Sequence, residues 1–221
     1  MMNDRVIVAL DVNFNEARRL VDILGERAVF YKVGLSLFYE AHKKAVLYLK
    51  ERGKKVFLDL KLADIPYQVE RAVRALQPLC PDLLTVHASA GAETIKSARR
   101  AAGINTKIIA VTVLTSHQEH GDIGQMVLEL AREAVDAGAD GIVCSGHEVK
   151  QFKKIYPEKI AVVPGIRLGR QVNDDQKRVV TPEDAILNGA DYIVVGREIT
   201  LSEDPAAAFE SIVVRLEGLN L

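Results

Sequence analysis

The chain has 221 residues, 48% of them apolar and 27% charged, and its formal net charge is −1. This length suits one substantial core, and the balanced charge excludes both the basic surface of a nucleic-acid-binding protein and a disordered acidic tail. Because the first apolar run is too short for a signal peptide or a membrane span, and Cys80 and Cys144 lack metal-ligand spacing, we expect a cytoplasmic protein with reduced thiols and no nucleic-acid or membrane partner.

Short apolar runs that favour strands alternate with longer amphipathic stretches along the chain. The expected strands are residues 6–10, 29–33, 56–60, 83–87, 107–113, 141–144, 160–163 and 192–195. The expected helices include residues 15–24, 36–51, 68–76, 92–102 and 123–137. Glycines follow several of these helical patterns, as is typical of a helix C-terminus: Gly25, Gly53, Gly103 and Gly138.

Eight strands that alternate with helices predict a parallel α/β sheet, closed into a single-domain TIM (β/α)8 barrel over residues 1–221. The continuous apolar character of several strands fits burial on both faces. Since periodicity alone does not show closure, an open doubly wound sheet is the alternative. In a barrel of this kind the active site lies at the carboxyl ends of the strands.

Charged residues follow the third apolar run in the pattern Asp-x-Lys-x-x-Asp, which begins at Asp59. Side chains alternate along a strand, so Asp59 and Lys61 are expected on one face and the neighbouring leucines on the other. Ionised groups at the end of a buried strand are costly unless they are paired, which favours a functional site over a surface ion pair of little value. Lys32 stands at the end of the preceding strand in the same way.

Further polar residues stand at or just beyond the strand ends, where a barrel would bring them together. The full set is Asp11, Lys32, Asp59, Lys61, Asp64, His87, Thr115, Arg167 and Arg197. His87 either lines the site or satisfies a hydrogen bond at its rim. Nothing fixes further ligands around His117 and His120, so we expect a polar loop there and no metal site.

The last strand ends in Gly196-Arg197, which suits a phosphate site. Barrels often bind phosphate after strands seven and eight, where glycine permits close approach of the backbone and arginine offers a planar fork for the oxygens. The seventh strand leads through Arg167 into a polar connection that ends near Thr181. A long connection of this kind favours a lid over an anion, and a merely solvated basic loop is the alternative.

These motifs together resemble one enzyme family over the full length of the chain. They resemble the pattern of bacterial orotidine 5′-monophosphate decarboxylases. The residues that carry the resemblance are Lys32, Asp59-x-Lys61-x-x-Asp64, Pro164-x-x-Arg167, Asp175-Gln176-x-Arg178 and Gly196-Arg197. The resemblance implies that orotidine 5′-monophosphate is converted to uridine 5′-monophosphate and CO2, the last step of UMP biosynthesis. It also implies that the reaction uses no cofactor and no metal.

The resemblance assigns catalytic roles to Lys32, Asp59, Lys61 and Asp64. Lys61 would lie beside the reacting carbon and protonate it, oriented by Lys32 and Asp59. Asp64 would reach into the site of the neighbouring subunit, so the active unit would be a homodimer with active sites shared across the interface. Substrate contacts are implied for Asp11, Lys32, Gln68, Thr115, Arg167, Gln176, Gly196 and Arg197.

Two positions depart from the family pattern. Tyr67-Gln68 stands where Asn-Thr is usual. Glu198 places a carboxylate beside the expected phosphate site, and it would repel the phosphate unless it points away or pairs with a lid arginine. One alternative is a magnesium-dependent sugar-phosphate decarboxylase or synthase of the same superfamily, which typically has an acidic residue in place of Lys32. The other is a non-catalytic phosphate-binding barrel, which has no need of Lys61.

Overall fold

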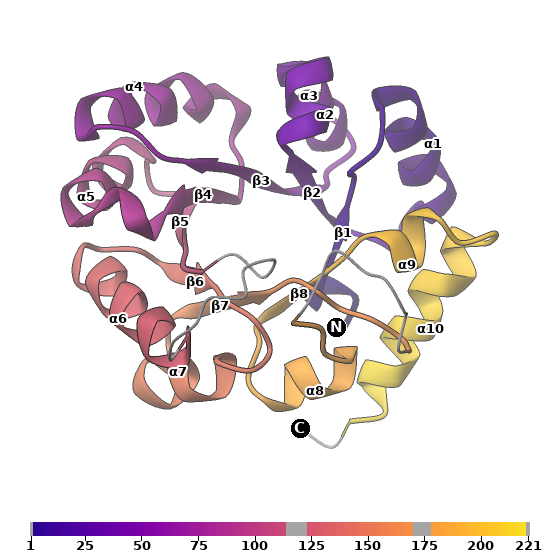
Figure 1. Cartoon of the computed structure of the whole chain (residues 1–221). Coiled ribbons are helices and arrows are strands. Elements are labelled where there is room, and N and C mark those ends of the chain that lie inside the picture. Colours follow the sequence, from indigo (N-terminus) through magenta and orange to yellow (C-terminus); the bar gives the residue numbers. More distant parts are fainter. Residues whose placement is uncertain (1, 114–122, 170–177, 220–221) are drawn as a thin grey trace.

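Eight parallel strands close into a barrel in the computed structural model of the chain, which describes residues 2–113, 123–169 and 178–219 (Figure 1). The strands follow one another around the barrel in chain order, and the first pairs with the last. This closure confirms the predicted TIM barrel and excludes the open sheet. The strands are β1 (Val6–Ala9), β2 (Phe30–Gly34), β3 (Lys55–Leu62), β4 (Leu83–His87), β5 (Lys107–Val111), β6 (Gly141–Val143), β7 (Ile160–Val163) and β8 (Tyr192–Val195).

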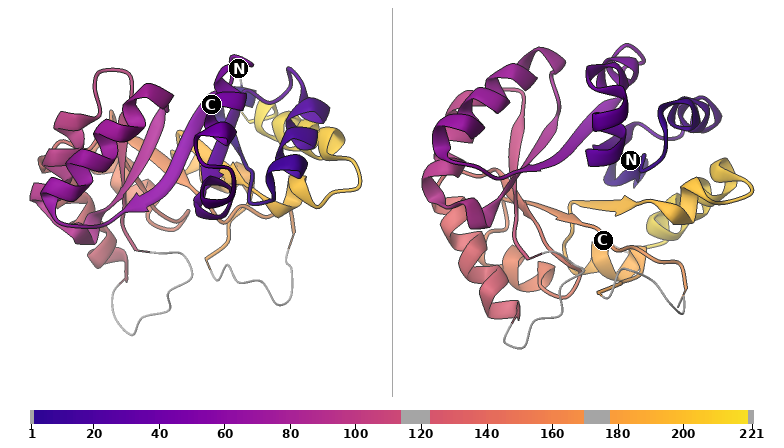
Figure 2. Two further views of the ribbon diagram at one scale, coloured as in Figure 1. Left: turned by 90° about the horizontal axis from the view of Figure 1, so that it is seen from above. Right: turned by 45° about the horizontal axis from the view of Figure 1, so that its top comes forward.

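Helices form an outer ring around the strands (Figures 1 and 2). They are α1 (Phe14–Leu24), α2 (Leu35–Ala41), α3 (Lys43–Lys50), α4 (Pro66–Leu76), α5 (Ala92–Ala101), α6 (Ile123–Asp136), α7 (Val149–Ile155), α8 (Pro182–Leu187), α9 (Arg197–Thr200) and α10 (Pro205–Glu217). Three short 3-10 helices are η1 (Met2–Arg5), η2 (Gln77–Leu79) and η3 (Ala88–Ala90). Within the described ranges, none of the helices has the length and apolar character that crossing a membrane requires.

The strands are buried on both faces because the barrel has two apolar layers. In β1, Val6 and Val8 point outward and pack with the helices, whereas Ile7 points into the barrel. Burial of a large apolar side chain contributes about 1.5–3 kcal/mol, so the strands retain apolar residues at nearly every position. The inner layer consists of Ile7, Ala9, Phe30, Phe57, Leu83, Ile109, Val162 and Val194.

Three aspartates join neighbouring strands at the amino ends of the barrel strands. These amino-end aspartates, Asp82, Asp140 and Asp191, stand directly before β4, β6 and β8. Each accepts one backbone N–H from the preceding strand and one cationic side chain from the helix before that strand, and such charge-assisted bonds are strong. The partners are Val56 and Lys50 for Asp82, Ile108 and Arg99 for Asp140, and Ala161 and Lys153 for Asp191.

The structure differs from the predicted elements within residues 36–51 and at the end of the third strand. Residues 36–51 form two helices because His42, with a φ of 51°, ends α2 and precedes α3. The third strand continues to Leu62, beyond the expected end at residue 60. Both differences involve a residue other than glycine with positive φ, since Lys61 also has a φ of 47°. Local propensity does not favour that conformation.

Candidate active site

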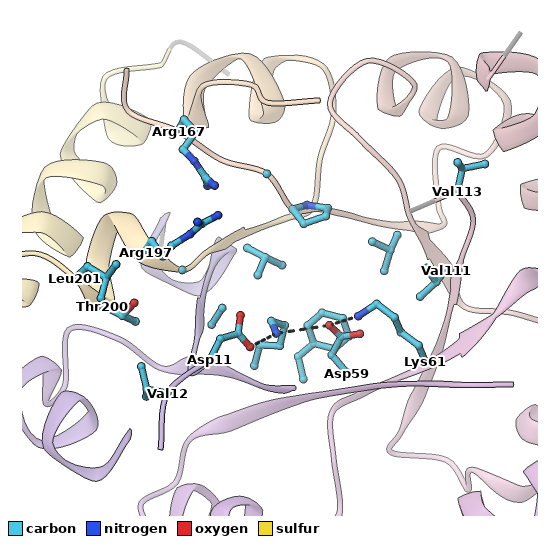
Figure 3. Close-up of a pocket in the computed structure, with 18 residues that line it drawn as sticks. Asp11, Val12, Asp59, Lys61, Val111, Val113, Arg167, Arg197, Thr200 and Leu201 are labelled. Carbon is cyan, nitrogen blue, oxygen red and sulfur yellow. Dashed lines mark hydrogen bonds and ion pairs between the residues drawn. The ribbon is translucent and has the colours of Figure 1, made fainter. Parts of the chain in front are cut away.

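A pocket of about 600 Å³ lies among the carboxyl ends of the strands (Figure 3). Its floor is apolar and includes Ala9, Phe57 and Val194, which also belong to the inner layer of the barrel. Its wall carries charged groups from opposite sides of the barrel. The predicted residues that line it are Asp11, Lys32, Asp59, Lys61, Arg167, Gly196 and Arg197.

Four of these side chains form a continuous row of alternating charge, which we call the charge row: Asp11, Lys32, Asp59 and Lys61. Lys32 Nζ donates to Asp11 Oδ1 at 2.8 Å and lies 3.7 Å from Asp59 Oδ2. Lys61 Nζ donates to the same Asp59 oxygen at 2.7 Å. Since Lys32 and Asp59 are buried, the opposite charges beside them offset their cost of desolvation. The prediction that Asp59 and Lys61 share one face is confirmed.

The backbone at Lys61 is unusual. Its φ of 47° lies in the left-handed region, where a residue with a Cβ costs about 1–3 kcal/mol. Pairing of β3 with β4 shifts register between Leu58 and Leu62, so the strand bulges there. Bulges re-aim side chains next to active sites, and this one lies at the position where Lys61 turns its ammonium toward Asp59.

Gly34, at the end of β2, leaves the space that the charge row occupies. A Cβ at this position would lie 2.8 Å from Asp11 Oδ1 and 2.8 Å from Lys32 Nζ. Any other residue would therefore push the Asp11–Lys32 pair apart. The prediction from sequence missed Gly34, although a glycine two residues after the strand-end Lys32 was an available signal.

Two arginines lie across the pocket from Asp59 and Lys61, and their guanidinium groups point toward one another (Figure 3). Arg167 follows β7, and Arg197 begins α9 directly after Gly196. Among the described residues, a Cβ on Gly196 would meet only Ala9, at an ordinary 3.6 Å, so packing against them does not demand glycine there. Gly196 and Arg197 both line the pocket, so a ligand bound in it can contact them.

Glu198, one of the departures from the family pattern, faces an arginine. Its Oε1 lies 4.0 Å from Arg167 Nε, and both side chains are largely buried. The carboxylate is therefore partly neutralised. This arrangement meets the condition under which Glu198 is compatible with an anion site.

The connection after β7 is closed at its base. Ile166 and Val180 form an isolated parallel bridge. Arg178 forms a buried ion pair with Glu148, which comes from the segment between β6 and α7. Desolvation lowers the pKa of the Arg178 guanidinium, and burial raises the pKa of the neighbouring Cys144 thiol to about 12. The Arg178–Glu148 ion pair thus links the segments that follow β6 and β7.

Some predicted site residues do not line the pocket. Asp64, just before α4, and Gln68, in its first turn, are exposed, and Asp64 Oδ1 accepts the N–H of Ile65 at 2.6 Å. His87 lies at the end of β4, where its Nδ1 is 2.7 Å from the hydroxyl of Ser89. Four residues considered from the sequence lie outside the described residues: Thr115, His117, His120 and Gln176.

Other residues at the site were not predicted. Thr200 and Leu201 line the pocket just after the Gly196-Arg197 motif, with no distinctive sequence signal. Thr85 on β4 is fully buried and donates to Asp59 Oδ1 at 3.1 Å, although it does not line the pocket. In the part of the chain that the structure describes, no group of three or more His, Cys, Asp or Glu residues could hold a metal ion.

Comparisons with known proteins agree over nearly the whole chain. The model of the orotidine 5′-phosphate decarboxylase / HUMPS family matches residues 4–212. The orotidine 5′-phosphate decarboxylase of Streptococcus pneumoniae strain G54 is 42% identical over 224 residues, which cover 96% of each chain. The crystal structure of orotidine 5′-phosphate decarboxylase from Lactobacillus acidophilus has a TM-score of 0.84 and 37% identity, over 96% of this chain and 99% of that one. An uncharacterised conserved protein from Geobacillus kaustophilus has a TM-score of 0.83 and 32% identity over the same shares. The chain therefore belongs to the orotidine 5′-phosphate decarboxylase / HUMPS family.

Proposed function

We propose that this protein decarboxylates orotidine 5′-monophosphate to uridine 5′-monophosphate and CO2, the last step of UMP biosynthesis, without a metal or cofactor. The observation that carries the proposal is the charge row, in which the ammonium of Lys61 is fixed 2.7 Å from Asp59 at the wall of the pocket. Relatives that are named orotidine 5′-phosphate decarboxylase, 42% identical over 96% of the chain, support it.

The reaction requires stabilisation of negative charge on one ring carbon. When the bond to the carboxylate breaks, its electron pair stays on that carbon in the plane of the ring, where delocalisation helps little. A fixed cation beside the carbon lowers the barrier. Lys61 supplies this cation and then donates a proton from Nζ, so the electron pair forms the new C–H bond. Its side chain is 33% exposed, so the resulting amine can regain a proton from solvent.

The rest of the charge row orients Lys61 and contacts the ribose. Asp59 bonds the Lys61 ammonium, and Lys32 lies on the other side of the same Asp59 oxygen. Asp11 and Lys32 also bind the ribose hydroxyls in this proposal, because the Asp11 side chain is more than half exposed and has room for a further donor.

Arg197, Gly196 and Arg167 hold the phosphate. Two guanidinium groups that face one another offer several parallel N–H donors to phosphate oxygens, and the adjacent glycine leaves space for them. By resemblance, Gln176 joins the phosphate contacts and Thr115 contacts the pyrimidine. Binding energy from these groups, remote from the reacting carbon, can be used to raise the rate of the chemical step.

The magnesium-dependent alternative fits the charge row less well. Lys32 Nζ is 2.8 Å from Asp11 and 3.7 Å from Asp59, so a divalent cation on these carboxylates would lie beside an ammonium group. Like charges at such distances repel. A non-catalytic phosphate-binding barrel gives no reason for the left-handed backbone that Lys61 adopts.

The direct test is the loss of orotate absorbance when purified protein meets orotidine 5′-monophosphate in excess chelator. Rapid loss is expected. A folded protein that leaves the absorbance unchanged contradicts the proposal, and addition of Mg²⁺ with a sugar-phosphate substrate would then test the alternative.

We further propose a homodimer whose active sites are shared. Asp64 is exposed and lies outside its own pocket, and it is followed by the exposed apolar side chains of Ile65 and Tyr67. A second copy would cover this apolar surface and receive Asp64 in its site.

Mixing two inactive variants tests the sharing. Asp64→Ala and Lys61→Ala each disable one contribution, so a mixed dimer contains one intact site. After random exchange of subunits, about a quarter of the wild-type activity is expected to return. No recovery, once mass spectrometry has shown exchange, would argue against shared sites.

A further inference from the structure

One buried hydroxyl joins the two ionised residues at the end of β3. Thr85 lies within β4 and has an exposed fraction of 0%. Its Oγ1 accepts the backbone N–H of Lys61 at 2.7 Å and donates to Asp59 Oδ1 at 3.1 Å. The hydroxyl therefore acts at once as an acceptor for Lys61 and as a donor to Asp59.

Irregular pairing between β3 and β4 explains why a side chain makes these bonds. The strands pair at Leu58 with Leu84 and next at Leu62 with Val86. Residues 59–61 of β3 thus lie opposite Thr85 alone, which interrupts the regular ladder. The N–H of Lys61 has the hydroxyl of Thr85 as its acceptor in place of a ladder carbonyl.

The same hydroxyl restrains an unfavourable backbone. Lys61 has a φ of 47°, a conformation that a residue with a Cβ keeps only where its surroundings enforce it. Asp59 Oδ2 bonds the ammonium of Lys61 at 2.7 Å. A closed ring of bonds therefore runs from the Lys61 backbone through Thr85 and Asp59 back to the Lys61 ammonium. This ring fixes both ends of the lysine side chain.

We propose that Thr85 is a positioning residue, whose hydroxyl places the Lys61 ammonium by orienting Asp59 and by holding the Lys61 backbone. The inference rests on the proposed decarboxylation. Thr85 is outside the pocket lining, so it acts through Asp59 and Lys61 and not on the substrate. Because a misplacement of about 1 Å can cost about 100-fold in rate, removal of the hydroxyl is expected to lower kcat and to leave KM nearly unchanged.

Three variants test this role. Thr85→Val keeps the shape and removes the hydroxyl, whereas Thr85→Ser keeps the hydroxyl. Thr112→Val is the matched control, because Thr112 is also buried and its hydroxyl donates to the backbone carbonyl of Val143 at 2.9 Å. We expect kcat to fall about 100-fold in Thr85→Val with KM within about twofold, and to stay within about fivefold of wild type in Thr85→Ser and Thr112→Val.

A wild-type kcat in Thr85→Val, or equal losses in Thr85→Val and Thr112→Val, would overturn the positioning role. If Thr85→Val does not fold, Thr85→Ser and Thr85→Ala decide the question, because they differ by one hydroxyl, and equal kcat values overturn the proposal. If the wild-type protein does not decarboxylate the substrate, the proposed function fails separately. The crystal structure of Thr85→Val then decides the inference: a changed Lys61 φ or a lost Asp59–Lys61 bond supports it, and unchanged geometry overturns it.

Discussion

The two ends of the barrel carry similar ion pairs in different surroundings. Each amino-end aspartate accepts a backbone N–H and a cationic side chain at the same oxygen, so its negative charge is paired with groups of the protein itself. The charge row at the carboxyl ends is paired as well, but Lys32 and Lys61 also line the pocket. An ion pair between strands and helices adds stability, whereas an ammonium held beside a cavity is available to a substrate.

Both ends of the barrel contain backbone with positive φ. Near the amino ends it occurs at glycines, with 95° at Gly138 and 101° at Gly189, where no Cβ opposes it, and at Cys80, with 46°, which ends η2 before β4. At the carboxyl end the residue with positive φ in β3 is Lys61. Left-handed backbone at a residue with a Cβ thus occurs at both ends, and Lys61 differs from Cys80 in that it lines the pocket.

Lys61→Ala should have the largest effect and the clearest separation of activity from stability. It removes the cation and the proton donor together, so kcat is expected to fall by about 10,000-fold or more. Asp59 keeps Lys32 and Thr85 as partners, so the midpoint of thermal unfolding should be unchanged or higher. Steady-state kinetics and thermal unfolding measure both. A lowered midpoint with retained activity would show that Lys61 serves stability and not catalysis, contrary to the comparison of the two ends.

Arg197→Ala should have the next largest effect. Loss of one charge-assisted phosphate contact is expected to lower kcat/KM about 100-fold. Arg74→Ala is the matched control, because its exposed ion pair with Glu70 on α4 is worth little. Unchanged kinetics in Arg197→Ala would contradict the assignment of the phosphate site to the residues that follow β8.

Asp140→Ala should affect stability alone. It removes the acceptor for the Ile108 N–H and for Arg99, so unfolding should become easier by about 2–3 kcal/mol, which is about 5–10 °C in the unfolding midpoint. The value of kcat/KM should stay within about twofold of wild type. Asp136→Ala, an exposed aspartate at the end of α6, is the control and should change stability by less than about 0.5 kcal/mol. A loss of activity at an unchanged midpoint would contradict the division between the two ends.

Much of the fold was predictable because apolar layers on both faces leave a strong signal. The strands at 83–87, 160–163 and 192–195 have the predicted bounds, and the others differ by one or two residues. The break at His42 was not predictable, because a residue with a Cβ rarely adopts a positive φ and no glycine marks the position. The amino-end aspartates had a partial signal, since Gly-Ala-Asp-x-Ile-Val occurs at both 138–143 and 189–194.

The site was predictable where the chemistry of one segment determines it. Asp59 and Lys61 stand two residues apart near the end of β3, and alternation predicted that their side chains point the same way, whereas their pairing was implied by the family resemblance. Thr85 was missed because its role depends on the shifted register between β3 and β4, which no local pattern records. The placement of Asp64 in a neighbouring subunit stays a prediction.

β1 and β8 pair directly, although their partners Ile7 and Val194 are 187 residues apart in the chain (194 − 7). A ribosome that adds about 5–20 residues per second needs about 10–40 s to synthesise that interval. Until β8 emerges, one edge of β1 has no partner in the native sheet, and open strand edges invite association with other chains. The four residues of β1 keep that edge short during translation. The last strand to be synthesised thus completes the sheet that the first strand began.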